Sequence, residues 1–123
     1  IVRTESEEDS LIKIQQLFEN HKIDGIFALD ENDSVAALKL GLKYGYKIPE
    51  NLSIIGFADG ILASRRLSPS LTTVSQHGPE IGEAAAKLLI ERLENTNFEE
   101  ELVYKTTVIK TELRDRESTK KTK

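Results

Sequence analysis

The chain has 123 residues, the length of one ordinary domain, and 38% of them are hydrophobic and 31% charged. Its formal charge of −4 excludes a strongly positive surface for non-specific nucleic-acid binding, and its apolar runs are far shorter than the ~20 residues that cross a bilayer. The absence of cysteine excludes disulfides, thiolate nucleophiles and zinc–thiolate or iron–sulfur sites. The chain begins at Ile1 and has no methionine, so we expect it to be a piece of a longer protein.

Helix and strand patterns alternate through the first half of the chain. A helix is predicted over 7–20, where Ser6 is a favourable N-cap and apolar residues recur at helical spacing. Residues 23–29 and 52–57 are short apolar runs typical of strands that are covered on both faces. A second helix is predicted between them, over 32–44. Two strands joined by a helix predict a βαβ unit, a parallel sheet and therefore an α/β fold class.

The second half contains a crossing segment, a helix and a strand. Residues 71–76 have the pattern of an extended crossing segment, and 79–93 form the clearest helix of the sequence, with an apolar face. The Val, Ile, Tyr and Thr residues of 102–113 predict a last strand. Three lysines lie in 119–123, which we expect to be a disordered, solvated tail, so that 1–118 is one partial domain.

Enzyme motifs are mostly missing from the sequence. It lacks a Walker loop, a Gly-x-Ser-x-Gly elbow, a Gly-x-Gly-x-x-Gly loop and a His-Glu-x-x-His pair. His21 follows a predicted helix end, where a surface role is ordinary. A triad of His77 with Asp59 and either Ser64 or Ser75 has no local motif to support it. We therefore predict no catalytic residue, and no cofactor.

Carboxylates follow both predicted parallel strands. Asp30, Glu31 and Asp33 come after the first strand, and Asp59 comes after the next. Ligands of open parallel sheets bind beyond the carboxyl ends of the strands, where ionised carboxylates accept strong hydrogen bonds from sugar hydroxyls. The same residues also suit helix capping and turns, so both interpretations stay open. Their spacing is not that of an EF-hand loop, and we predict no metal site.

Several short motifs occur together in a specific order and at specific separations. They are 24–28 (DGIFA), 36–38 (AAL), 45–57 (GYKIPENLSIIGF), 68–76 (SPSLTTVSQ) and the ending 112–118. This set of motifs resembles the regulatory domain of lactose-repressor/galactose-repressor (LacI/GalR) transcription factors, and the resemblance extends from about residue 9 to residue 118.

This resemblance implies the fold of periplasmic sugar-binding proteins, with two α/β lobes, three crossings and a small ligand in the cleft. The chain then corresponds to a truncated C-terminal lobe of parallel-sheet α/β layers, together with the helix 79–93, which in the family belongs to the other lobe. The first strand and helix of the second lobe are missing. Without its lobe, the helix must expose its apolar stripe, pack back or dock onto another chain, so domain swapping is a further hypothesis.

The family's effector residues carry over in part. Asp30 and Glu31 occupy the place of the family's Asn-Asp pair, and Gln76 matches a polar residue at the crossing. Ala58 stands where the family has an acid that grips the effector, and its side chain accepts no hydrogen bond. We expect Asp59 or Asp30 to substitute for this acid. The resemblance therefore predicts effector binding by Asp30, Asp59 and Gln76.

Two segments resemble surfaces through which family members form dimers. They are the helix 32–44 and the segment 61–67, and ordinary core packing is an equal alternative for the helix but a weaker one for the segment. The predicted interface residues are Val35, Leu38, Leu42, Ile61, Leu62 and Arg65.

The resemblance implies a cytoplasmic bacterial transcriptional regulator. The partners are a small, carbohydrate-like effector, a second copy in a homodimer, and operator DNA contacted only through a headpiece that lies outside this sequence, with no membrane contact. The alternative is a periplasmic sugar-binding protein of a transporter, built on the same fold. The two differ upstream, where a regulator has a helix-turn-helix and a transport protein has a signal peptide.

Overall fold

The computed structural model describes residues 1–57, 59–60, 67–94 and 105–121. The chain divides into two compact units, one made of residues 1–75 and 112–123 and the other of residues 76–111. Within the described ranges, no helix is long and apolar enough to cross a membrane.

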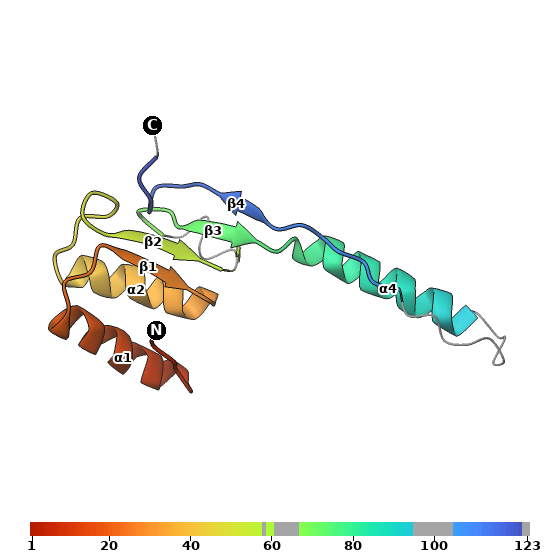
Figure 1. Cartoon of the computed structure of the whole chain (residues 1–123), viewed down its shortest axis with the longest axis horizontal. Helices are drawn as coiled ribbons and strands as arrows, with labels where there is room; N and C mark the ends of the chain where they lie inside the picture. Colours follow the sequence, from red (N-terminus) through yellow and green to blue (C-terminus); the bar gives the residue numbers. More distant parts are fainter. Residues whose placement is uncertain (58, 61–66, 95–104, 122–123) are drawn as a thin grey trace. The chain divides into compact units, whose positions relative to one another are not determined.

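The first unit contains a four-stranded sheet with the order β1-β2-β3-β4. Its first three strands are parallel, and β4 runs antiparallel to β3. Two helices, α1 and α2, lie on one side of the sheet (Figure 1). The predicted α/β class with a largely parallel sheet is confirmed. The elements are α1 (Glu7–Asn20), β1 (Gly25–Ala28), α2 (Glu31–Lys43), β2 (Ser53–Gly56), β3 (Thr72–Ser75) and β4 (Glu112–Arg114).

Side-chain caps and one glycine fix the ends of the two helices. Ser6 is the N-cap of α1, and its hydroxyl accepts a hydrogen bond from the Asp9 backbone N–H at 3.2 Å. Asp30 does the same for α2, and this cap starts the helix at Glu31. After α2 the chain reverses at Gly45, whose φ of +80° is a conformation that favours glycine.

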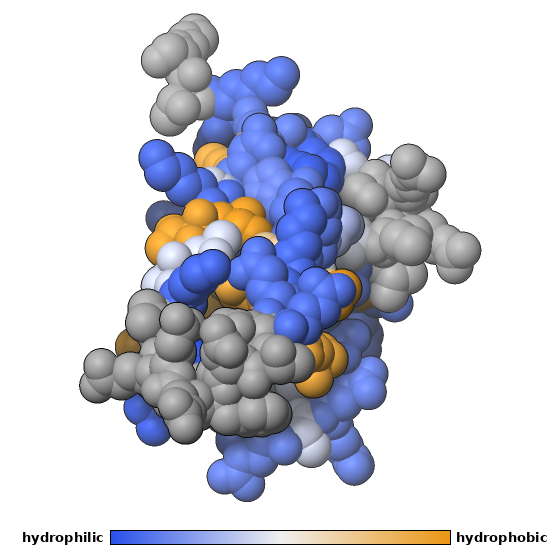
Figure 2. Space-filling view, turned by 90° about the vertical axis from the view of Figure 1, so that its right-hand side faces the viewer, coloured by the Kyte–Doolittle hydropathy of each residue, from blue (hydrophilic) through white to orange (hydrophobic). Residues whose placement is uncertain are grey.

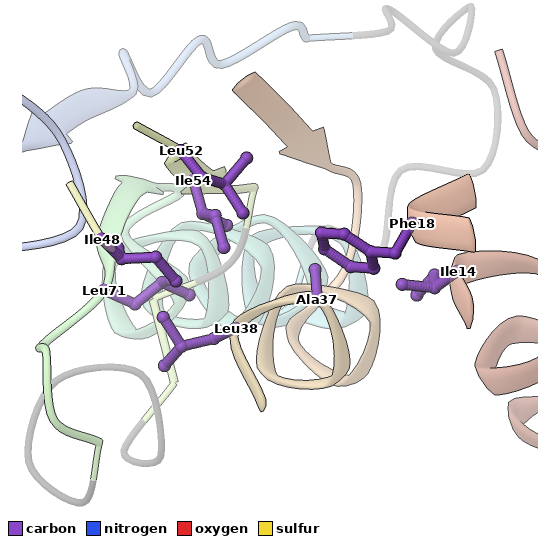
Figure 3. Close-up of a cluster of buried hydrophobic side chains, with 8 residues drawn as sticks. All are labelled: Ile14, Phe18, Ala37, Leu38, Ile48, Leu52, Ile54 and Leu71. Carbon is purple, nitrogen blue, oxygen red and sulfur yellow. The ribbon is translucent and has the colours of Figure 1, made fainter. Parts of the chain in front are cut away.

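The core lies between the two helices and the sheet (Figure 3). Leu38 of α2 is 1% exposed, so it belongs to this core, and its predicted place at a dimer interface is wrong. The physical reason is that the apolar stripe of α2 faces β1 and β2 of its own chain. The core side chains are Ile14, Phe18, Ala37, Leu38, Ile48, Leu52, Ile54 and Leu71.

The segment after β4 is bound to the middle of the sheet through Ser118. Its side chain is fully buried, donates to the Ile54 carbonyl at 2.6 Å and accepts from the Thr72 N–H at 2.8 Å. Thr119, which the sequence assigns to the tail, lies with its hydroxyl 2.8 Å from that of Thr72. Thr119 is therefore held at the sheet, and the exposed Lys120 follows it.

The second unit contains helix α4 (Gly78–Glu94), which confirms the predicted helix 79–93. None of its residues, all of which the structure describes, is buried. Four of its large apolar side chains are exposed by 46% to 73%, and hydrophobic patches interrupt the hydrophilic surface of the molecule in Figure 2. These side chains are Ile81, Leu89, Ile90 and Leu93.

The last strand is shorter than the predicted 102–113. Residues 105–111 are described but form no strand, and β4 begins at Glu112. The pairing starts there because Glu112 is opposite Ser75, the last residue of β3. Residues 105–111 also have side chains that favour strands, but within the described ranges there is no neighbouring strand with which they pair. The rest of the predicted strand, 102–104, lies outside the described residues.

Candidate functional site

The carboxyl ends of β1 and β2 lie at one edge of the sheet, which is called the carboxyl edge below. The two strands are parallel and in register, with Ala28 opposite Gly56. Asp30 follows the first of these residues and Asp59 follows the second. Ligands of parallel α/β sheets bind beyond such an edge, so the chemistry of its side chains decides what can bind here.

Asp30 is a helix cap. Its Oδ1 accepts a hydrogen bond from the Asp33 N–H at 2.8 Å, and the residue is exposed. Capping engages one carboxylate oxygen and holds the side chain at the N-terminus of α2. The capping interpretation is therefore realised, while effector binding by Asp30 stays a prediction.

Glu31 lies against the segment that follows β2. A Cβ atom placed on Gly60 would meet the Glu31 carboxylate, the far end of a flexible side chain, which would then have to shift. Asp33, by contrast, accepts a hydrogen bond from the Ser10 hydroxyl of α1. Of the acids after β1, Glu31 is thus close to the segment after β2, and Asp33 links the two helices.

Asp59 is held by three donors. Its side chain is 7% exposed, and it accepts from the Thr73 hydroxyl at 2.7 Å, from Arg116 Nη2 at 2.7 Å and from Arg114 Nη1. Burial disfavours the charged carboxylate, but the hydrogen bonds from Arg116 and Thr73 and the charges of both arginines outweigh it. Together they hold the pKa of Asp59 below its ordinary value.

The two arginines differ in their exposure and in the number of hydrogen bonds that their guanidinium groups donate within the protein. Arg116 is 17% exposed and also donates from Nη1 to the Leu71 carbonyl at 2.6 Å and to the Thr73 hydroxyl at 2.9 Å. Arg114 is 46% exposed, and its hydrogen bond goes to Asp59. Sequence reasoning missed both arginines, since they are 55 and 57 residues away from Asp59. The alternating Arg-x-Arg at the end of the last strand was the available signal.

Gln76 is exposed and belongs to the second unit, so its part in effector binding stays a prediction. Ile61, Leu62 and Arg65 lie outside the described residues, and so does Ala58.

On α2, two predicted interface residues remain accessible. Val35 is partly buried and Leu42 is 44% exposed, so their contact with a partner stays a prediction. Among the residues that the structure describes, no group of three His, Asp or Glu side chains is placed to hold a metal ion.

Comparison with known families identifies the fold. The family model described as "Periplasmic binding protein-like domain" matches residues 2–119. This match covers nearly the whole chain, and the chain belongs to this family.

The relatives identify the branch of the family. A ribose operon repressor of Halalkalibacterium halodurans is 43% identical over 79 residues, which are 63% of this chain and 24% of the relative. The HTH-type transcriptional repressor PurR of Aliivibrio fischeri is 32% identical over 87 residues, 71% of this chain and 26% of the relative. The chain thus spans about a quarter of the length of these curated relatives.

A solved structure gives the same result. The LacI family transcriptional regulator of an Arthrobacter species, in complex with lactose, is 31% identical with a TM-score of 0.76, and the match covers 98% of this chain and 44% of that chain. The predicted resemblance is confirmed: the chain is a part of a LacI/GalR-type effector-binding domain.

Proposed function

We propose that the chain is the effector-binding and dimerising portion of a bacterial LacI/GalR-type transcriptional regulator, in which a small sugar-like ligand controls operator binding. The observation that carries this proposal is that the relatives named above are operon repressors and transcriptional regulators. One of them is a complex with lactose, which supports a carbohydrate effector.

The carboxyl edge supplies the ligand-binding half of the mechanism. Asp30 offers a carboxylate oxygen to hydroxyl groups, and α2, at whose start it lies, packs against β1 and β2. A ligand that binds one arrangement of the two lobes better than the other shifts the equilibrium toward it, and the shift can reach only the ligand's difference in affinity. In the regulator, this shift changes the affinity for the operator.

Dimerisation and location belong to the same proposal. Val35 and Leu42 of α2 are accessible for contact with a second copy, in contrast to the buried Leu38. A regulator that binds operator DNA works in the cytoplasm, without membrane contact and without enzymatic activity.

The second candidate is a periplasmic sugar-binding protein, which shares the fold. The repressor names of the relatives favour the regulator. Reading the coding frame upstream of Ile1 in the source DNA distinguishes the two. A helix-turn-helix with a further lobe supports the regulator, and a signal peptide overturns it.

A binding experiment on the longer protein tests the mechanism. Operator retention in a gel-shift assay is measured with and without ribose, lactose and other sugars, for the parent and for Asp30→Asn. The control is Asp24→Asn, an exposed aspartate at the opposite end of β1. We expect Asp30→Asn to weaken the response to the effector and Asp24→Asn to leave it. An equal response in all three proteins would remove Asp30 from the site.

A further inference from the structure

Both connections between the two units of the chain run through neighbouring strands of the first unit. β3 ends at Ser75 and the second unit begins at Gln76, while the second unit ends at Thr111, directly before β4. The two strands are antiparallel, and the last residue of β3, Ser75, is opposite the first residue of β4, Glu112. Their ladder consists of three residue pairs, and so short a pairing is weak by itself. Contacts that hold β4 on β3 therefore also determine where both connections leave the first unit.

Asp59 accepts hydrogen bonds from side chains of both strands. Its Oδ1 accepts from the Thr73 hydroxyl of β3 and from Arg116 Nη2, both at 2.7 Å, and its Oδ2 accepts from Arg114 Nη1 of β4. Arg116, two residues beyond β4, also donates from Nη1 to the Leu71 carbonyl and the Thr73 hydroxyl, just before and within β3. Thr73 and Arg114 are opposite each other in the ladder. One carboxylate thus joins β3 to β4 and to the segment that follows β4.

The Asp59 side chain is used inside the protein. It is 7% exposed, and both of its oxygens are engaged. A carboxylate has about four lone-pair sites, and three donors occupy most of them. Two of these donors are guanidinium groups, whose charge-assisted hydrogen bonds are stronger than neutral ones. The carboxylate is therefore suited to holding its donors in position.

The segment that carries Asp59 belongs to the carboxyl edge. It follows β2, and at its next residue, Gly60, the backbone is approached by the Glu31 carboxylate from the start of α2. Ligands of parallel α/β sheets bind beyond such an edge. A ligand that moves this segment also moves Asp59, and with it the side chains of β3 and β4 that donate to Asp59.

We infer that Asp59 is a positioning residue, which ties the segment after β2 to β3 and β4 and so fixes where both connections leave the first unit. The inference rests on the proposed function and deepens it, because a ligand at the carboxyl edge then acts on the two connections through this carboxylate. This role differs from the direct effector contact that the sequence predicts for Asp59.

The test is a double electron–electron resonance measurement on the 123-residue chain with pairs of spin labels. The chain has no cysteine, so two introduced cysteines are the only labelling sites. One pair joins α2 to β4, with Lys39→Cys and Leu113→Cys at exposed positions. The reference pair joins two exposed positions of the first unit away from β4, with Lys39→Cys and Glu50→Cys. Each pair gives a distribution of label-to-label distances.

The pairs are measured in the parent, Asp59→Asn, Arg114→Gln and the matched control Asp115→Asn. Asp115 is an exposed acid of the same region, and it accepts from the Thr119 hydroxyl at 3.0 Å. We expect Asp59→Asn to broaden the α2–β4 distribution and to leave the reference pair unchanged, because asparagine lacks the charge that holds two guanidinium groups. Arg114→Gln removes one of the three donors and should broaden the same distribution less. Asp115→Asn should leave both distributions like the parent's.

Two results would overturn the inference. A distribution in Asp59→Asn that is equal to the parent's would mean that the backbone ladder alone holds β4, and it would favour direct effector contact by Asp59. Broadening of the reference pair as well would mean that Asp59 stabilises the whole unit without positioning β4. Circular dichroism verifies that each variant is folded, and if Asp59→Asn is not, an unchanged distribution in Arg114→Gln overturns the inference. The proposed function fails separately, if the longer protein shows no effector-dependent operator binding.

Discussion

Helices α2 and α4 have similar amphipathic sequences, but they differ in what covers them. In α2, Ser34, Ala37, Leu38 and Gly41 are buried against the sheet and α1. In α4, which is longer, no residue is buried. The helical period determines which side chains share a face, but a neighbouring surface determines whether that face is buried. The first unit supplies this surface for α2, and α4 has to obtain it elsewhere.

The packing of each helix determines how much it contributes to the stability of the chain. Helices of about 15 residues are marginal in water, and most helical stability in proteins comes from packing. We therefore expect the stability of the chain to come from the first unit, and substitutions there to have the larger effects.

The largest effect is expected in the core. Leu38→Ala removes a side chain that is 1% exposed and leaves a cavity, which should lower the free energy of unfolding by about 2–5 kcal/mol. The matched control is Leu89→Ala in α4, where the side chain is 60% exposed and the loss should stay below about 0.5 kcal/mol. Urea denaturation measures both, and similar losses would contradict the contrast between the helices.

A smaller effect is expected where the C-terminal segment meets the sheet. Ser118→Ala removes the donor to the Ile54 carbonyl and the acceptor for the Thr72 N–H, and both partners are buried residues. An unsatisfied buried group costs about 1–3 kcal/mol, so urea denaturation should show a loss of that order. Thr107→Ala, at an exposed position, is the control. A Ser118→Ala protein as stable as this control would exclude Ser118 as an anchor.

Capping of α2 should give the next effect. Asp30→Ala removes the acceptor for the Asp33 N–H and should cost about 1 kcal/mol, because N-cap substitutions typically do. Asp30→Asn keeps an acceptor and should cost a few tenths of a kcal/mol, which makes it the suitable variant for binding studies. Thermal unfolding followed by circular dichroism compares the two. If they unfold alike, the cap does not depend on the acceptor.

The smallest effect is a change in the pH dependence of stability. The pKa of Asp59 is lower in the folded chain than its ordinary value of 3.8, so the unfolded chain binds more protons between the two values. The stability that Asp59 contributes is present above pH 3.8 and is lost as the pH falls through its folded pKa.

Asp59→Asn should therefore show a shallower decline of the free energy of unfolding below that pH than the parent does. Thr73→Val, which removes one donor to Asp59, should give an intermediate slope. Urea denaturation at a series of acidic pH values measures these slopes. Identical slopes in the parent and Asp59→Asn would show that Asp59 makes no such contribution.

Local patterns in the sequence predicted the elements well. The caps at Ser6 and Asp30 and the apolar periods gave the helices and the parallel pair of strands, because these signals act between residues close together in the chain. The predicted role of Leu38 was wrong for a related reason. The apolar face of a helix has the same residue spacing in the sequence whether it packs against the sheet of its own chain or against a partner chain.

The site was predicted less completely than the fold. The carboxylates after β1 and β2 could be found from their position, but the partners of Asp59 lie in β4 and just beyond it. Long-range pairing of this kind is set by sheet order, which local patterns do not specify. Over 105–111 the predicted strand is wrong, because a strand depends on a partner and not on propensity alone.

Amide hydrogen exchange, measured in this chain and in the longer protein that contains it, tests the central claim most directly. The claim is that the chain is one part of a two-lobed effector-binding domain, with a self-sufficient first unit and a helix α4 that needs a partner surface. We predict slow exchange for α2 in both proteins, and slow exchange for α4 only in the longer one. Equally slow exchange of α4 in the isolated chain, or fast exchange of α4 in both, would contradict the account.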